Sequence, residues 1–292
     1  MQARAATWWT ILRICVEERL VYRGDFALGT LMRFLPILTQ IFLWTTVFYA
    51  VGQAGGGDAA SGGGEQSPGG PRIQGFSRDD VIAYYLLTMV ARAFSSMPGL
   101  ASGVARQVRE GEIKKFLLQP IDLLSFLLLA RIAHKLVYYA VATLPFTFVF
   151  WLCGDYFPDW PEPQVWAAFL LSLLMGFALG FFLEATLGMI GFWFLEVSSL
   201  LFVYMLANFF FSGHMFPLDF LTDSVPEWLA TLLWFQPLKF LAYFPAAVYL
   251  GKITGPELWQ GLALQAAWVT FFFFAARYAM QRGYRRYSGF GG

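Results

Sequence analysis

Long apolar runs separated by short polar stretches dominate the chain, and this pattern predicts a bundle of membrane helices. Six runs fall in the length range, ~17–25 residues, of helices that span a hydrocarbon core. We expect spans at residues 34–51, 81–97, 136–152, 165–183, 192–211 and 258–280. The predicted fold class is therefore all-α and integral to the membrane, with one transmembrane domain over residues 1–292.

The N-terminal segment, residues 3–24, follows a different pattern and predicts an interfacial helix. Arg13 and Glu17 lie on one face of this segment. Apolar side chains recur every four residues on another face, at Trp8, Leu12, Val16 and Leu20. A helix of this kind lies in the plane of the lipid headgroups, so membrane lipids are expected partners.

Three connecting regions stand out between the runs. Residues 52–75 consist mainly of Gly, Ser, Ala and Pro, which cannot bury enough apolar surface to order a segment, so we expect a flexible external loop. Residues 213–256 contain an apolar stretch only about half as long as a span, which predicts short external re-entrant helices before the last span. Residues 106–122 form the most polar internal stretch.

Composition and charge support a membrane protein with both ends in the cytoplasm. Charged residues make up only 13% of the chain, too few to cover a water-soluble domain of 292 residues. With six spans, the basic residues fall on or near the cytoplasmic side, except Arg72, Arg78, Lys239 and Lys252. A seventh span would move the basic cluster at residues 282–286 outside, against the positive-inside rule.

Catalytic and metal-binding chemistry have little support in the sequence. The Gly-Lys pair at Gly251-Lys252 is followed by Ile253, so a nucleotide-binding phosphate loop is absent. His134 and His214 fall on opposite predicted sides of the membrane and cannot share a zinc ion. We therefore expect no catalytic residues, no metal, no cofactor bound by this chain, and no nucleic-acid partner.

Three charged residues near the membrane and one polar stripe remain as candidate functional groups. Arg92, Glu184 and Glu196 are intramembrane charges that either pair, reach toward the headgroups, or form an ion site. The polar stripe recurs every four residues in the fifth span, at Tyr204, Asn208 and Ser212. These side chains serve either helix-to-helix hydrogen bonding or the lining of a translocation pathway.

The segment REGEIKKFLLQPID, residues 109–122, has charged turns around a glycine and an apolar turn before Pro120. It is either a solvated inner loop or a docking helix for a partner. This segment is similar to the coupling segment of type-2 ABC transporter permeases. SGHMFPLDFL (212–221) and QPLKFLAYFPAAVYLGK (236–252) resemble the same family's external region between spans five and six. The long loop at 52–75 departs from the family's pattern.

The resemblance implies a bacterial cytoplasmic membrane protein from the branch in which two permeases pair beside a separate ATPase. By that resemblance, spans two and five lie at the dimer seam, and ATP and Mg²⁺ bind to the partner. The resemblance also implies a set of residues that dock on the ATPase, namely Arg109, Glu110, Gly111, Glu112, Lys114 and Phe116.

The sequence thus predicts the permease subunit of an ATP-driven exporter. It would work as a dimer with an identical or sister permease and with two copies of the ATPase subunit. An ion-coupled secondary transporter is the first alternative, although neither internal repeats nor a mid-membrane carboxylate supports it. A membrane-embedded lipid-modifying enzyme is the second, and it would need convergent acids or histidines at one interface.

Overall fold

The described part of the protein is helical. The computed structural model describes residues 2–21, 23–58, 72–118, 121–157, 160–194, 196–222 and 225–287. Within these ranges the extended structure is limited to an isolated bridge between Ile73 and Phe76. The predicted all-α fold class is confirmed.

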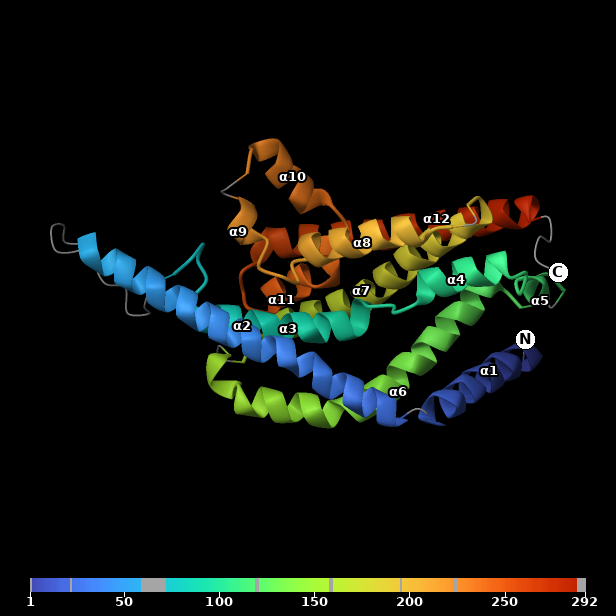
Figure 1. The fold of residues 1–292 in the computed structure, drawn as a ribbon, viewed down its shortest axis with the longest axis horizontal. Helices are drawn as coiled ribbons and strands as arrows, with labels where there is room; N and C mark the ends of the chain where they lie inside the picture. The colour runs from blue at the N-terminus through green and yellow to red at the C-terminus, as the bar shows by residue number, and fades with distance from the viewer. Residues whose placement is uncertain are drawn as a thin grey trace.

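Long helices run roughly along one axis of the molecule (Figure 1). They are α2 (Arg23–Asp58), α3 (Arg78–Ser95), α6 (Leu123–Leu152), α7 (Pro163–Met189), α8 (Ser198–Phe211) and α12 (Gly255–Arg286). Among the described residues, three helical stretches are long and apolar enough to cross a membrane, namely α6, α7 with its 3-10 extension η2 (Ile190–Phe192), and α12. The helix α8 is apolar but shorter. A multi-span membrane protein is supported, while the count of six stays a prediction.

Several helices differ in extent from the expected spans. The helix expected at 136–152 begins at Leu123, because the Asp122 carboxylate caps it by accepting the Ser125 N–H at 2.9 Å. The helix expected at 192–211 begins only at Ser198. Residues 52–58 continue α2 instead of forming a loop, and residues 59–71 of the expected loop lie outside the described ranges.

The region expected to hold short helices before the last span does contain them. They are α9 (Asp219–Thr222), α10 (Glu227–Phe235), the 3-10 turn η3 (Leu238–Leu241) and α11 (Tyr243–Tyr249). The helix α11 packs against α7 and α3, and its Tyr243 and Phe244 are almost fully buried. Whether these helices re-enter the membrane stays a prediction.

Both ends of the described chain lie at the same end of the molecule (Figure 1). The N-terminal helix α1 (Gln2–Val21), which coincides with the expected interfacial helix, packs against α6. The C-terminal end of α12 lies at the same end as α4 (Leu100–Arg109) and α5 (Lys114–Leu118). The connection between α6 and α7, which includes the 3-10 turn η1 (Gly154–Tyr156), lies at the opposite end.

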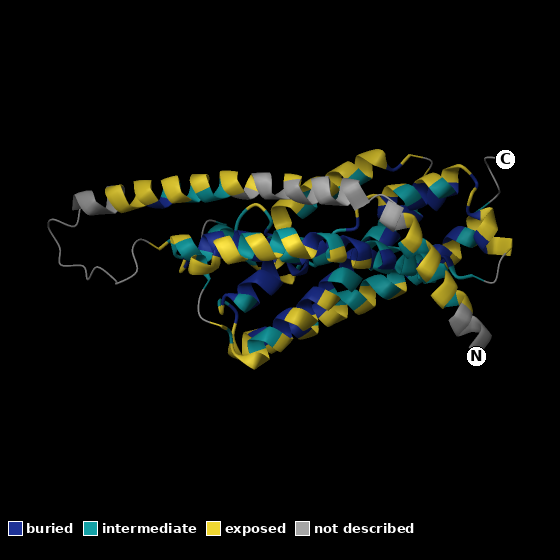
Figure 2. Cartoon of the chain, turned by 90° about the horizontal axis from the view of Figure 1, so that it is seen from below, coloured by how far each residue is buried: buried dark blue, intermediate teal, exposed yellow. Residues whose placement is uncertain are grey.

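The helix α7 occupies the centre of the bundle and contacts α3, α4, α11 and α12. Figure 2 shows that buried positions gather where the helices face one another, with exposed positions outside. Glycines on α7 and η2 permit close approach: a Cβ at Gly188 of α7 would lie 2.9 Å from the Ala101 carbonyl oxygen, and one at Gly191 of η2 would lie 2.9 Å from the Ala105 Cα. Small residues at helix contacts are typical of membrane bundles.

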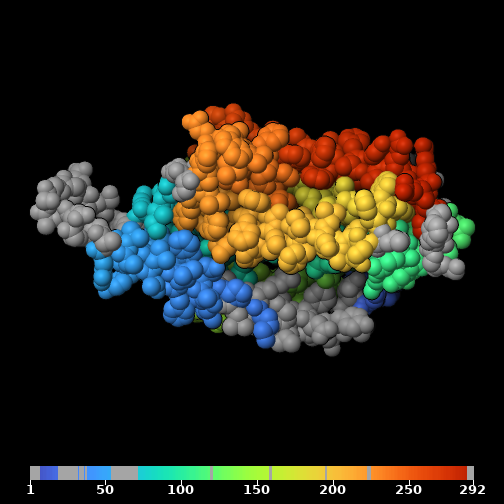
Figure 3. Space-filling model, turned by 45° about the horizontal axis from the view of Figure 1, so that its top comes forward, coloured from blue at the N-terminus to red at the C-terminus, as the bar shows by residue number. Residues whose placement is uncertain are grey.

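The helix α8 is packed quite differently from α7. None of its residues is buried within the single chain, and Figure 3 shows it lying along the surface. The helix α8 therefore has little cover from the rest of the described chain.

Candidate functional site

A cavity of about 710 Å³ lies between α3 and α8. Its wall also includes Gln40 from α2, the break between α3 and α4, and the loop that follows α8. This volume lies within the roughly 300–1,000 Å³ that is usual for small-molecule sites. The cavity is therefore a candidate site for a small molecule.

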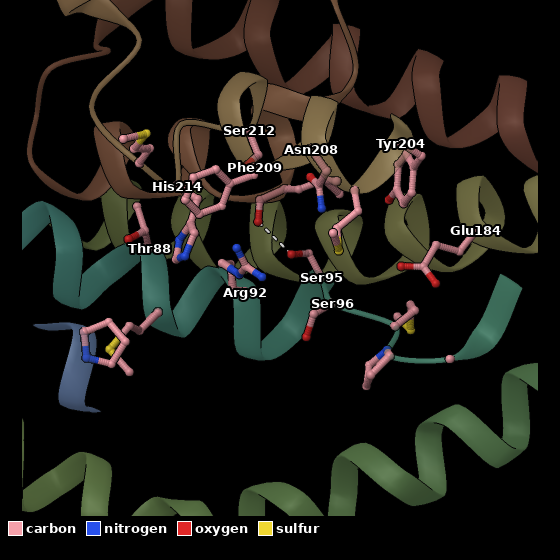
Figure 4. Close-up of a pocket in the computed structure, with 18 of the residues that line it drawn as sticks. Thr88, Arg92, Ser95, Ser96, Glu184, Tyr204, Asn208, Phe209, Ser212 and His214 are labelled. Carbon is pink, nitrogen blue, oxygen red and sulfur yellow. Dashed lines mark hydrogen bonds between the residues drawn. The ribbon is translucent and has the colours of Figure 1, made fainter. Parts of the chain in front are cut away.

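The polar stripe expected on the fifth span lies in this wall. Tyr204, Asn208 and Ser212 of α8 all line the cavity (Figure 4). They face α3, which contributes Arg92 and Ser95. The location agrees with the pathway-lining interpretation of the stripe, and a role in transport stays a prediction.

Sequence reasoning missed other polar residues of the wall. Thr88 and Ser95 on α3 and His214 after α8 line the cavity together with the predicted stripe. The spacing of Thr88, Arg92 and Ser95, four and three residues apart, was the available signal, because it puts all three on one face of a helix.

A break in the second membrane segment shapes one side of the cavity. The helix α3 ends at Ser95, and Pro98 and Gly99 precede α4. Proline lacks a backbone N–H and disfavours helix at the residue before it, and Gly99 has a φ of +71°, where glycine is favoured. The predicted single span at 81–97 is therefore followed by a second helix across a sharp turn.

Charged side chains hold both halves of this break. At the end of α3, Lys135 donates to the carbonyl oxygens of Ala93 and, at 2.8 Å, of Ser96. Arg131 donates to the Pro98 carbonyl at 2.9 Å. These cations meet the partially negative C-terminal end of α3, which is a favourable arrangement.

Glu184 holds the other half. Its carboxylate, on α7, lies close to the backbone of Met97 and Ala101, around the start of α4. A helix N-terminus carries a partial positive charge and unpaired N–H groups, so an anion is favoured there. Glu184 thus places a carboxyl group near the start of α4, beside the cavity.

The structure brings together only part of the expected group of intramembrane charges. Arg92 and Glu184 line the same cavity, and an ion pair between them stays a prediction. Glu196 lies elsewhere and is exposed, where it contacts Arg109 at 3.4 Å and accepts the Ser198 N–H at 2.9 Å. Hydrogen bonds from Ser198 lower the pKa of Glu196. Glu196 precedes α8 instead of lying within it, and the pairing of these three charges stays a prediction.

The expected docking segment forms a compact turn beyond α4. Gly111 has a φ of +78°, so the chain reverses where the sequence predicted a tight turn. The side chains of Arg109, Glu110 and Glu112 are about half exposed, at 47%, 49% and 53%, and Lys114 is exposed as well.

One expected docking residue is placed differently. Phe116 is only 8% exposed, and its ring packs against Phe126 with centroids 5.3 Å apart. Ile113 is fully buried beside it. The exposed apolar side chains are Leu117 and Leu118, at 47% and 87%. Phe116 therefore anchors the turn to the bundle, because its side chain belongs to the protein's own core.

The exposed charges of this turn make weak local pairs. Arg106 and Glu110 lie 4.0 Å apart, and Lys115 and Glu112 lie 3.7 Å apart. Pairs this exposed contribute roughly 0–1 kcal/mol, because water and salt screen them. They can exchange partners at little cost when another surface approaches.

Hydrogen bonds from tyrosines hold the loop that follows α8. Tyr84 donates to the carbonyl of Gly213, and Tyr85 donates to that of Met215. The Tyr243 N–H donates to the Ser212 carbonyl at 2.9 Å. These bonds fix the loop after α8, which carries His214.

A smaller apolar pocket of about 320 Å³ lies on another side of α8. Phe211, Leu232 and Phe272 contribute to its lining, and Tyr204 lines both this pocket and the larger cavity. The helix α8 is thus flanked by hollow space on two sides, which explains its lack of buried residues. Among the described residues, we found no group of three His, Cys, Asp or Glu side chains that could hold a metal ion.

Comparison with known families assigns the chain. The sequence model described as "ABC-2 family transporter protein" matches residues 67–291, which include every element from α3 to α12. A comparison with curated proteins found no match. The family match covers more than half of the chain and includes both the cavity wall of α3 and α8 and the turn after α4. The chain therefore belongs to the ABC-2 family of transporter proteins.

Proposed function

We propose that this chain is the membrane-spanning permease subunit of an ATP-driven exporter. Two permeases, identical or sister chains, would form the translocation path, and two copies of a separate ABC ATPase subunit would bind ATP and Mg²⁺. Membership of the ABC-2 family supports a permease of an ABC system. We place the protein in a bacterial cytoplasmic membrane with both termini in the cytoplasm, on the charge distribution and on the shared position of α1 and the end of α12.

The observation that carries the proposal is the position of α4. This helix of 10 residues begins at the cavity wall, where Pro98, Gly99 and Ala101 are lining residues, and ends at the exposed docking turn. At ~1.5 Å per residue it is about 15 Å long. A force on the turn is therefore transmitted along one short helix to the break beside the cavity.

The path along α4 has defined contacts at both ends. Glu184 lies near its start, and Lys135 and Arg131 hold the end of α3 and the break that precede it. Ile113 and Phe116 anchor the turn beyond its end in the core. Movement of a docked ATPase would therefore shift α4 together with the end of α3. This is a mechanism by which ATP-driven closure of the partner changes the cavity.

The packing of α8 supports a second permease as the missing partner. A helix without buried residues in one chain loses little by separating from it and gains cover from another membrane helix. The arrangement agrees with the seam that the family resemblance places at spans two and five, since α3 and α8 enclose the cavity.

Reversal of one docking charge tests the proposal. The Glu112 side chain is 53% exposed and contacts only Lys115 weakly, so Glu112→Lys leaves the packing of the turn unchanged. We expect the ATPase to bind about tenfold more weakly, a change of ~1.4 kcal/mol, with a matching fall in transport-coupled ATP hydrolysis. The measurement is ATPase activity of the reconstituted complex as a function of ATPase-subunit concentration.

The matched control is Glu162→Lys, which makes the same charge change at an exposed residue preceding α7, at the opposite end of the molecule. This variant should bind and stimulate the ATPase like the wild type. Equal binding and equal ATP hydrolysis for the Glu112 variant, the Glu162 variant and the wild type would refute the docking assignment.

A further inference from the structure

The wall of the cavity between α3 and α8 contains polar atoms whose hydrogen bonds the chain does not complete. Among the described residues, five buried side-chain nitrogen or oxygen atoms lack a partner. Three of them belong to residues of this one wall, namely Gln40 Oε1, Asn208 Oδ1 and His214 Nδ1. They come from α2, from α8 and from the loop after α8, so three separate elements converge there.

An unpaired buried polar atom is costly, and a structure normally supplies a partner from protein, water or ligand. The side chains of Asn208 and His214 project into the cavity (Figure 4). A rotation of the Asn208 amide, the Gln40 amide or the His214 ring turns the unpaired atom toward the cavity. The wall therefore favours an occupant that brings hydrogen-bond donors.

The charged residues of the same wall do not call for an ionic occupant. Glu184 lies close to the backbone of Met97 and Ala101, and Arg92 interacts with other groups of the chain. The two side chains carry opposite charges, so the wall is close to neutral as a whole. A strongly charged ligand would have to compete with these existing partners.

A hydroxyl group fits the atoms left over. A hydroxyl donates to an amide oxygen or to an imidazole nitrogen, and it accepts from an amide N–H or an imidazole N–H. It therefore suits all three side chains, whichever way the amide or the ring is turned. Burial, with a smaller effect from the nearby charge of Arg92, lowers the pKa of His214 to about 3, so its ring is neutral at neutral pH and offers an acceptor nitrogen.

Apolar side chains make up much of the remaining lining. Met89, Phe146, Leu201, Met205 and Phe209 contribute carbon and sulfur surface to the wall. An occupant that covers this surface and also satisfies the polar atoms has an apolar body and hydroxyl groups. The cavity of about 710 Å³ limits it to the size of a typical drug molecule.

We propose that this cavity binds an uncharged, hydroxyl-bearing amphiphile, with its hydroxyl groups against Gln40, Asn208 and His214. The inference that this amphiphile is the transported substrate rests on the proposed permease function. The inference that the cavity binds it is testable on this chain without an ATPase.

The test uses photolabelling of the purified full-length chain in lipid nanodiscs. The probes are three octyl amphiphiles with the same diazirine in the alkyl chain and with a glucoside, a trimethylammonium or a sulfate head group. Labelled peptides are mapped by mass spectrometry, and unlabelled octyl glucoside serves as competitor. The variants are Asn208→Leu and Gln40→Leu, with Gln260→Leu, at an exposed position of α12, as the matched control.

We expect saturable labelling of α3 and α8 by the glucoside alone, displaced by the unlabelled competitor. Asn208→Leu and Gln40→Leu should each weaken this labelling about tenfold, as expected for the loss of one hydrogen bond in a binding site, while Gln260→Leu leaves it unchanged. Equal labelling by all three probes, or glucoside labelling that the competitor fails to displace in the wild type, would overturn the proposal even if a variant misfolded.

The two proposals fail separately. Loss of glucoside binding with normal docking of an ATPase would contradict the ligand assignment alone. Specific glucoside binding by a chain that neither docks nor stimulates an ATPase would contradict the permease function alone.

Discussion

Replacement of Gly180 by alanine tests the contact on which the break beside the cavity depends. A Cβ added to Gly180 of α7 would lie 2.1 Å from the Ser95 carbonyl oxygen, at the end of α3. The obstacle is a backbone atom, which cannot rotate away as a side chain would. The Ser95 hydroxyl is also bound to the Leu241 carbonyl at 2.7 Å, so α3 is held in place from a second direction.

The expected magnitude follows from two opposing effects. Overpacking of a close contact costs typically ~1–3 kcal/mol, and a 2.1 Å approach to backbone belongs at the upper end of that range. Alanine is favoured over glycine within a helix by about 1 kcal/mol. We therefore expect Gly180→Ala to lower the free energy of unfolding by about 2 kcal/mol.

The assay is the fraction of monodisperse protein that remains after heating in mild detergent, followed by size-exclusion chromatography. The matched control is Gly103→Ala on α4, where an added Cβ would meet nothing within 4 Å. The control should be as stable as the wild type or slightly more stable. Equal apparent melting temperatures for the two variants would refute the close packing of α7 on the end of α3.

Two further predictions concern ion pairs at the two ends of the bundle. Burial alone raises the pKa of Asp122, but hydrogen bonds from Ser125 and the charge of Arg277, 2.6 Å away, outweigh it and hold the pKa below 3.8. The ionised carboxylate stabilises the fold fully above the unfolded-state pKa, and this stabilisation is lost as the pH falls through the lower folded-state pKa. Asp122→Ala should therefore lower the free energy of unfolding by ~1–2 kcal/mol in urea titrations at neutral pH. The cost should be small at a pH acid enough to protonate the carboxyl. A cost independent of pH would contradict this reasoning. At the other end, Lys252 contacts Asp80 at 2.8 Å, and both side chains are 24% exposed. Lys252→Ala should lower the free energy of unfolding by ~1–2 kcal/mol and speed amide hydrogen exchange at residues 73–80. Unchanged exchange would contradict the role of the pair.

The apolar pattern of the sequence was sufficient to predict the helical membrane fold, and local backbone chemistry explains where its boundaries fail. Mean hydropathy over a window of residues carries no signal for an N-cap. The span predicted from residue 136 therefore begins later than the helix α6, which starts at Leu123. Polar residues on α6 also hid its first turns, because Arg131 and Lys135 bind backbone carbonyls inside the bundle instead of facing water.

The candidate site was predictable in part for a similar reason. Tyr204, Asn208 and Ser212 share one face of a single helix, so their common position follows from helical periodicity alone. Their meeting with Glu184 and His214 depends on how separate helices pack, which periodicity within one segment does not determine. Phe116 was misplaced because an apolar residue in a polar turn fits a partner's groove and the protein's own core equally well from sequence alone.

The most direct test of the central claim is the intact mass of the complex that this chain forms in its native membrane. The tagged chain would be purified in mild detergent and measured by native mass spectrometry with ATP present. The account predicts two permease chains, identical or sister, with two copies of an ATP-binding subunit and turnover of ATP. A chain that purifies without a nucleotide-binding partner, shows no ATP turnover and carries out flux driven by an ion gradient would contradict it.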